Sequence, residues 1–157
     1  MMKFLLENWK KFLGENIDIV YCNTEDSEDC ELEYHEQAWA LAKESSINIL
    51  SDKDLKAVAV MDSKVVGAVF DAINNNKYSW DTIVHPDYQR RGVAKKLIDF
   101  AMQEKEDLSD AYGGLEYDLD VTNPHMRAYL KQLGFIGDGR SMTHIEDEER
   151  KNETSEN

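Results

Sequence analysis

The chain has 157 residues, of which 41% are hydrophobic and 32% charged, and its formal net charge is −14 at pH 7. This length fits one domain with its own core. No apolar run approaches the roughly 18 residues of a membrane span, and the N-terminus is not of the signal-peptide type, so we expect no membrane association and a cytoplasmic location. The acidic balance argues against nucleic acid as a partner, which usually requires a basic surface. The acidity either serves solubility alone or attracts cationic partners such as amines and basic peptides.

The first half of the chain predicts two helices, a short strand and a hairpin. Apolar residues recur at helical spacing in two segments, and β-branched residues dominate three others. Asp62-Ser63 separates the last two of these, which is typical of a hairpin turn. We therefore predict helices over 2–13 and 31–43 and strands over 17–21, 56–61 and 64–70.

The second half alternates strands with helices. Asn123-Pro124 has the chemistry of a helix start, and Gly134 ends that helix. We predict strands over 78–84, 117–121 and 135–144 and helices over 93–105 and 124–133. Residues 146–157 contain no apolar side chain and are predicted to be an acidic disordered tail. The remainder, 1–145, is predicted to be a single mixed α/β (α+β) domain.

The two cysteines are Cys22 and Cys30, and their C-x7-C spacing matches no common zinc pattern. The nearby His35 does not complete one. Two cysteines also do not make a disulfide framework, so we predict two reduced thiols and no metal site.

The most informative segment is the turn between the strand over 78–84 and the helix that begins at Val93. Gly92 and Ala94 are small enough for a ligand to approach the backbone closely. Unpaired amides and the helix dipole make a helix start an anion site. Positions 89–96 hold four of the 18 basic residues of the chain: Arg90, Arg91, Lys95 and Lys96. A solvated basic helix face would explain the charges alone, but Gln-x-x-Gly-x-Ala directly after a strand favours a bound phosphate group.

Two blocks of the sequence resemble the GNAT (Gcn5-related N-acetyltransferase) family. The segment from Val84 to Ala94 is similar to the family's acetyl-CoA signature, [Q/R]-x-x-G-x-[G/A]. The segment from Asn123 to Phe135, in which an asparagine opens a helix that ends in Leu-Gly-Phe, resembles its second block. The resemblance covers roughly residues 56–140. It implies a mixed, mostly antiparallel sheet flanked by helices, with splayed strands that form an acetyl-CoA cleft. It also implies acetyl transfer to a primary amine by direct attack in a ternary complex.

The resemblance assigns cofactor contacts within these blocks. The main chains of Ile83 and Val84 would pair with the pantetheine arm, and the Val84 amide would stabilise the oxyanion. Asn123 would hydrogen-bond the pantetheine. The CoA pyrophosphate would be held by a set of loop residues: Gln89, Arg90, Arg91, Gly92, Val93 and Ala94.

The catalytic residues depart from the family pattern, because Leu130 occupies the position of the tyrosine that protonates the leaving thiolate in many members. Tyr129, about 100° away round the helix, is either this acid or a core aromatic. The reserve candidates are Tyr112, Tyr117 and His125. Asp81 is the first choice for a base or substrate anchor, since an amine of pKa about 10.4 must lose a proton before it attacks. A structural hydrogen bond is an equally compatible role for Asp81. The alternative function is therefore a non-catalytic GNAT-like module that binds acyl-CoA or a protein partner.

Overall fold

The computed structural model of the protein describes residues 16–22, 30–44, 53–121, 124–137 and 141–147. The helix predicted over 2–13 and the role predicted for Asn123 lie outside these residues. The chain divides into two compact units, one built from 1–72 and 80–104 and the other from 73–79 and 105–157. The single domain predicted over 1–145 stays a prediction.

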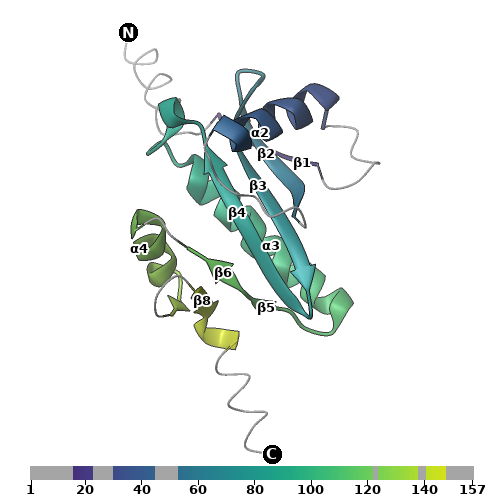
Figure 1. Ribbon diagram of the computed structural model, residues 1–157, viewed down its shortest axis with the longest axis vertical. Coiled ribbons are helices and arrows are strands. Elements are labelled where there is room, and N and C mark those ends of the chain that lie inside the picture. Colours follow the sequence, from purple (N-terminus) through teal and green to yellow (C-terminus); the bar gives the residue numbers. More distant parts are fainter. Residues whose placement is uncertain (1–15, 23–29, 45–52, 122–123, 138–140, 148–157) are drawn as a thin grey trace, which may run out of the picture. The chain divides into compact units, whose positions relative to one another are not determined.

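Helices and strands are interspersed along the chain, as predicted for a mixed α/β fold (Figure 1). They are β1 (Asp18–Tyr21), α2 (Leu32–Glu44), β2 (Asp54–Met61), β3 (Lys64–Asn74), β4 (Lys77–Val84), η1 (Pro86–Tyr88), α3 (Val93–Tyr112), β5 (Glu116–Tyr117), β6 (Leu119–Asp120), α4 (Pro124–Gln132), β7 (Phe135–Ile136) and β8 (Ser141–His144). One sheet has the order β1-β2-β3-β4-β5, and its β1–β2 and β2–β3 pairs are antiparallel. The predicted fold class, a mainly antiparallel sheet flanked by helices, is confirmed. Among the described residues, no helix has the length and apolarity needed to cross a membrane.

The hairpin of β2 and β3 forms the centre of the first unit. Asp62 and Ser63 have φ angles of 52° and 63°, the left-handed pair that a two-residue hairpin turn requires. Both strands are buried along most of their length rather than at alternate positions, which indicates a sheet covered on both faces. Phe70 and Ala68 join a core cluster with Ala38, Leu41 and Ala42 of α2. Gly67 lies on the opposite face of β3 from Ala68 and Phe70, and this face packs against Val93 and Leu97 of α3.

The first unit also encloses a lysine. The Lys56 side chain is 3% exposed, and its Nζ lies 3.5 Å from Asp71 Oδ2 and 3.3 Å from Glu104 Oε2. Burial lowers the pKa of Lys56, but the charges of Asp71, Tyr21 and Glu104 outweigh burial and raise it above its ordinary value. The ammonium is therefore charged at neutral pH inside the unit.

The prediction of two reduced thiols is wrong, because Cys22 and Cys30 form a disulfide. Cys22 follows β1 and Cys30 lies two residues before α2, so the fold brings the end of one element to the start of the next. The two Cα atoms are 5.2 Å apart, within the range that a disulfide spans.

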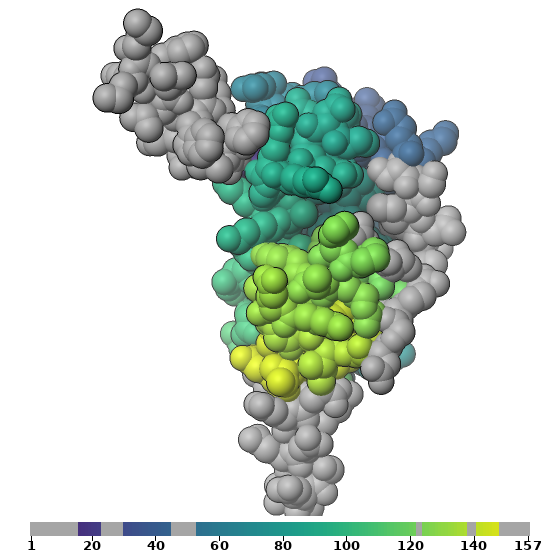
Figure 2. Space-filling model, turned by 90° about the vertical axis from the view of Figure 1, so that its left-hand side faces the viewer, coloured from purple at the N-terminus to yellow at the C-terminus, as the bar shows by residue number. Residues whose placement is uncertain are grey.

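The second unit is built from short strands. The strand predicted over 117–121 is split, since β5 pairs in parallel with the start of β4 whereas β6 pairs with β8. The late strand predicted over 135–144 is likewise two antiparallel strands, β7 and β8. Figure 2 shows the surface formed by α4 and the C-terminal strands of this unit, in green to yellow.

The beginning of the predicted tail is structured, which corrects its boundary. Asp147 is 2% exposed and accepts hydrogen bonds from Lys105 Nζ at 3.2 Å and from the Tyr117 amide at 2.9 Å. A buried carboxylate with two donors is satisfied in the fold, so residues 146 and 147 belong to the second unit. Residues 148–157 lie outside the described part of the chain.

Candidate functional site

The predicted phosphate-binding segment runs from the end of β4 through η1 to the start of α3, all within the first unit. The His85 amide donates to Val66 O at 2.8 Å, so the chain stays attached to β3 as it leaves β4. His85 Nδ1 then accepts from the Asp87 amide at 3.1 Å, and the Tyr88 amide donates to His85 O at 2.8 Å. These local bonds fix the direction in which the chain approaches α3.

The backbone turns sharply just before the helix. Arg90 and Gly92 have φ angles of 64° and 83°. Glycine adopts such an angle without steric cost, whereas for arginine it is a strained conformation of the kind found at ligand-binding turns. The Lys96 amide donates to Gly92 O at 3.2 Å. The preceding amides, those of Val93 and Ala94 among them, therefore stand at the open end of α3, where an anion is favoured.

The basic side chains in and near this segment differ in their surroundings. Lys96 Nζ donates to Ile17 O at 3.2 Å, so this lysine ties the helix start to the residue before β1. The Arg91 guanidinium lies 5.3 Å from the centre of the Tyr88 ring, and Lys64 Nζ lies 5.6 Å from the same ring. The remaining basic residues, Arg90 and Lys95, are exposed. The loop thus presents the positive charges of Arg90 and Lys95 at its surface.

The strand before the loop offers main-chain groups to a ligand. The Ile83 side chain is buried in the core, and Val84 is half-buried. The parallel pairing of β4 with β5 ends at Tyr78–Tyr117, and in the described part of the chain no other strand pairs with that edge of β4. An edge of this kind can pair with an extended ligand. The Gln89 amide group points back to the strand, with Nε2 3.5 Å from Val84 O.

Asp81 forms an ion pair with Lys53, a residue that no motif of the sequence marks as functional. Its Oδ2 lies 2.8 Å from Nζ of Lys53, and the two side chains are 22% and 10% exposed. Lys53 precedes β2, 28 positions away in the sequence, and no local pattern marks this pair. The burial alternation of β4 also changes phase, since Trp80 and Ile83 are both buried, which leaves Asp81 partly exposed.

The candidate acids lie in the second unit. Tyr129 is half-buried with an enclosed hydroxyl oxygen, whereas Leu130, at the family's tyrosine position, is 1% exposed and packs in the core. Burial, followed by the charges of Glu106, Asp147 and Glu146, raises the pKa of Tyr117, whose ring packs against Phe135. The other reserve candidates, Tyr112 and His125, are exposed.

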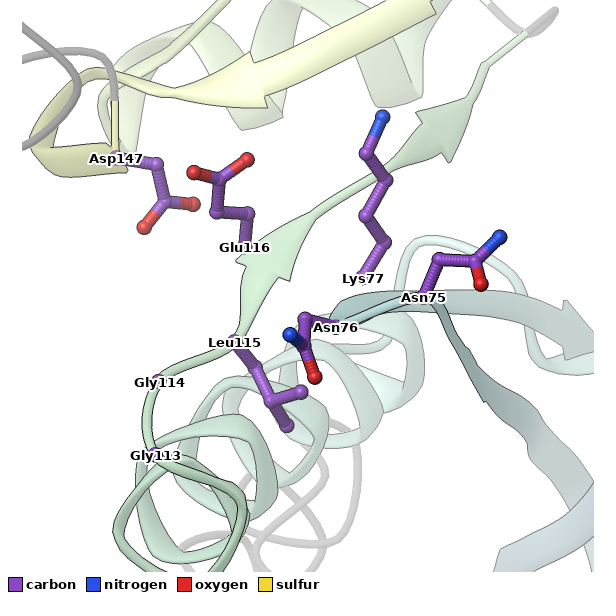
Figure 3. Close-up of a pocket in the computed structure, with 8 residues that line it drawn as sticks. All are labelled: Asn75, Asn76, Lys77, Gly113, Gly114, Leu115, Glu116 and Asp147. Atoms are coloured by element: carbon purple, nitrogen blue, oxygen red, sulfur yellow. The ribbon is translucent and has the colours of Figure 1, made fainter.

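A polar hollow of about 330 Å³ in the second unit contains none of the predicted site residues. It lies between the β3–β4 turn and the loop from α3 to β5, and Figure 3 shows the Glu116 carboxylate beside Asp147. Its lining residues are Asn75, Asn76, Lys77, Gly113, Gly114, Leu115, Glu116 and Asp147.

Solved structures with the same fold are acetyltransferases. An acyl-CoA N-acyltransferase from Pseudomonas aeruginosa is 15% identical with a TM-score of 0.61, and the match covers 82% of this chain and 99% of that one. Ard1 from Thermoplasma volcanium is 15% identical with a TM-score of 0.57, over 82% and 94% of the two chains. An aminoglycoside 6′-N-acetyltransferase complexed with coenzyme A is 11% identical with a TM-score of 0.55, over 80% and 93%.

The sequence itself matches a family model. No curated protein matches the chain significantly. The model for the acetyltransferase (GNAT) domain matches residues 53–136, more than half of the chain. This range includes β4, the turn at Gly92 and α4. The chain therefore belongs to the GNAT acetyltransferase family.

Proposed function

We propose that the protein transfers an acetyl group from acetyl-CoA to a primary amine. The observation that carries this proposal is the turn from β4 into α3, where Gly92 at φ 83° precedes a helix whose first amides have no partner within the helix. The backbone of Gly92, Val93 and Ala94, with nearby basic side chains, holds the pyrophosphate. The free edge of β4 pairs with pantetheine through Ile83 and Val84. Coenzyme A bound to a protein of the same fold supports this assignment.

The reaction is a direct displacement in a ternary complex. The amine nitrogen attacks the thioester carbonyl carbon, and the negative charge that develops on the carbonyl oxygen is stabilised by the Val84 amide. The C–S bond then breaks, the thiolate takes a proton, and the acetylated amine loses one. Asp81 receives the amine proton, directly or through water, and Tyr129 supplies the thiolate proton.

The acceptor is a cationic amine, small or peptidic. The chain's net charge of −14 attracts cations to its surface, and one protein of the same fold acts on aminoglycosides. We propose that the reaction takes place in the cytoplasm. The Cys22–Cys30 disulfide argues against this location, because disulfides are rare in the cytoplasm.

Acetyl-CoA is expected to raise the melting temperature of the protein, and the variant with both Arg91→Glu and Gly92→Glu is expected to show no rise. At 100 times its Kd the ligand adds about 2.7 kcal/mol, which corresponds to several degrees for a chain of this size. The variant places two carboxylates where the pyrophosphate binds. Thermal unfolding with and without acetyl-CoA measures the effect. Lys43→Glu, an exposed charge reversal on α2, is the matched control and keeps the rise. Absence of any rise in the wild type at millimolar acetyl-CoA contradicts the proposal.

Turnover distinguishes an enzyme from a non-catalytic module. The buried Leu130, at the position of the family's tyrosine, favours the module. The acceptor panel consists of polyamines, aminoglycosides, amino acids and basic peptides. Release of free coenzyme A, followed by mass spectrometry of the acetylated product, identifies the acceptor. Cofactor binding without turnover on any member of the panel supports the module instead.

Asp81→Asn is expected to lower kcat by about 10²- to 10⁴-fold at pH 7, the range typical of a lost general base. The rise in melting temperature with acetyl-CoA is expected to persist, because the change is not in the phosphate loop. Lys53→Met removes the same ion pair but keeps the carboxylate, so it serves as the control and retains most of kcat. Equal losses of kcat in both variants would assign Asp81 a structural role.

A further inference from the structure

Three side chains that carry metal-binding atoms meet in the first unit, away from the β4–α3 turn. They are the sulfurs of Cys22 and Cys30 and an imidazole nitrogen of His35, and these atoms all lie within 4.8 Å of one another. We infer that Cys22, Cys30 and His35 form a thiolate–imidazole site for Zn²⁺ when the disulfide is reduced. This inference goes beyond the proposed acetyl transfer and does not depend on it.

Backbone hydrogen bonds hold two of these residues, Cys22 and His35. The Cys22 amide donates to Lys56 O at 2.8 Å, which ties this cysteine to β2. Cys30 lies just before α2, and His35 lies in the first turn of that helix, where its amide donates to Glu31 O at 3.3 Å. The ligands therefore lie next to the end of β1, just before α2 and in the first turn of α2.

The three donor atoms lie close enough together for one zinc ion after reduction. Zn–S bonds of about 2.3 Å and Zn–N bonds of about 2.0 Å at tetrahedral angles place donor atoms about 3.5–3.8 Å apart. After reduction, rotation of the two cysteine side chains would separate the sulfurs to about this distance, and the imidazole nitrogen, now within 4.8 Å of both sulfurs, would move to bonding distance of the metal. Within the described part of the chain, the His35 imidazole makes no hydrogen bond, so its nitrogens are available to a metal.

The surroundings favour a metal once the thiols are free. Cys22 is 4% exposed, and Cys30 and His35 are half-buried, so the site is partly shielded yet reachable. Two thiolates neutralise the charge of one Zn²⁺, and three protein ligands leave a fourth position for water. The acidic chain also attracts divalent cations.

Reduction of the Cys22–Cys30 disulfide requires a reductant, either a thiol or a phosphine. Two electrons and two protons convert the disulfide to two thiols, and the reductant is oxidised to its own disulfide or phosphine oxide. Zn²⁺ then displaces the two thiol protons as it binds. Each sulfur belongs either to the S–S bond or to a thiolate ligand, so bound zinc and the disulfide exclude each other.

The test uses the full chain, reduced with a phosphine and then freed of it under anaerobic conditions. Co²⁺ replaces Zn²⁺ as an absorbing probe, because thiolate-to-cobalt charge transfer reports sulfur ligation directly. The reduced protein is expected to bind one equivalent of Co²⁺ with this absorption and to lose it on addition of one equivalent of Zn²⁺. The oxidised protein is expected to show no such absorption.

Variants identify the ligands. His35→Gln and Cys30→Ser are each expected to weaken Zn²⁺ binding at least about 100-fold, since even loss of an outer-sphere partner costs 10- to 100-fold. His125→Gln, an exposed histidine in the second unit, is the matched control and keeps wild-type affinity. Cys30→Ser is chosen over Cys22→Ser because Cys22 is buried, and circular dichroism checks that each variant is folded. Absence of charge-transfer absorption in the reduced wild type, or wild-type affinity in His35→Gln, overturns the inference.

Discussion

Replacing Asp147 by alanine is expected to remove about 3–5 kcal/mol from the free energy of unfolding, as is typical when one member of a buried ion pair loses its partner. The Lys105 and Asp147 side chains are 4% and 3% exposed. The variant leaves the Lys105 ammonium inside the unit with the Tyr117 ring 4.5 Å away, and a ring face compensates only part of a lost carboxylate. It also removes the acceptor of the Tyr117 amide. Urea denaturation at pH 7 measures the loss.

Two further variants separate the ion pair from a general effect of substitution. Asp110→Ala removes an exposed carboxylate from α3, and its effect is expected to stay within about 0.5 kcal/mol. The double variant with Lys105→Met and Asp147→Asn removes both charges and keeps an acceptor for the Tyr117 amide. It is expected to recover most of the stability. A loss below about 1 kcal/mol in Asp147→Ala, the range of surface pairs, would show that the pair is not buried in solution.

The buried position of Asp147 could not be predicted from the sequence, because it depends on a distant partner. Its partner Lys105 is 42 positions away, and a run of charged residues at the end of a chain has the composition of a disordered tail. The same limit explains the Cys22–Cys30 disulfide, which depends on where β1 ends relative to α2. Spacing along the chain alone does not reveal that the two cysteines meet.

Features contained in one continuous segment were predicted well. The hairpin at Asp62-Ser63 follows from two apolar runs and a two-residue turn, and its positive φ angles agree. The segment from β4 to α3 was predicted because strand, turn and helix start are consecutive. The acid and base were not fixed by the sequence, because the partners that set their roles come from distant segments, as Lys53 does for Asp81. Those two roles stay proposals.

Replacing Gly67 by alanine is expected both to destabilise the first unit and to weaken acetyl-CoA binding. A Cβ atom at Gly67 would lie 2.8 Å from Val93 Cγ1, 3.0 Å from Leu97 Cδ1 and 3.0 Å from the carbonyl oxygen of Ile83. The two side chains can move, but the Ile83 oxygen moves only with β4. Overpacking of this kind costs about 1–3 kcal/mol, and valine, with two more methyl groups, is expected to cost more.

The effect on the cofactor follows from where these contacts lie. Val93 is the first residue of α3, and Ile83 belongs to the strand edge proposed to pair with pantetheine. Pushing the helix away from β3 is therefore expected to displace the amides proposed to bind the pyrophosphate from the strand proposed to position the thioester. Misplacement by about 1 Å far from the reacting atoms can cost 10²-fold in rate. Urea denaturation and the melting-temperature rise with acetyl-CoA measure the two losses separately.

A compensating change tests the steric origin of both losses. In the variant with Gly67→Ala and Val93→Ala, the Cγ1 atom that would lie 2.8 Å from the new Cβ is removed. If the new methyl group acts by displacing α3, the double variant binds acetyl-CoA more tightly than Gly67→Ala alone, even though Val93→Ala by itself leaves a cavity and lowers stability. Normal acetyl-CoA binding by a destabilised Gly67→Ala variant would instead mean that the packing of α3 on β3 and the geometry of the phosphate turn are independent. The close approach at Gly67 would then serve stability alone.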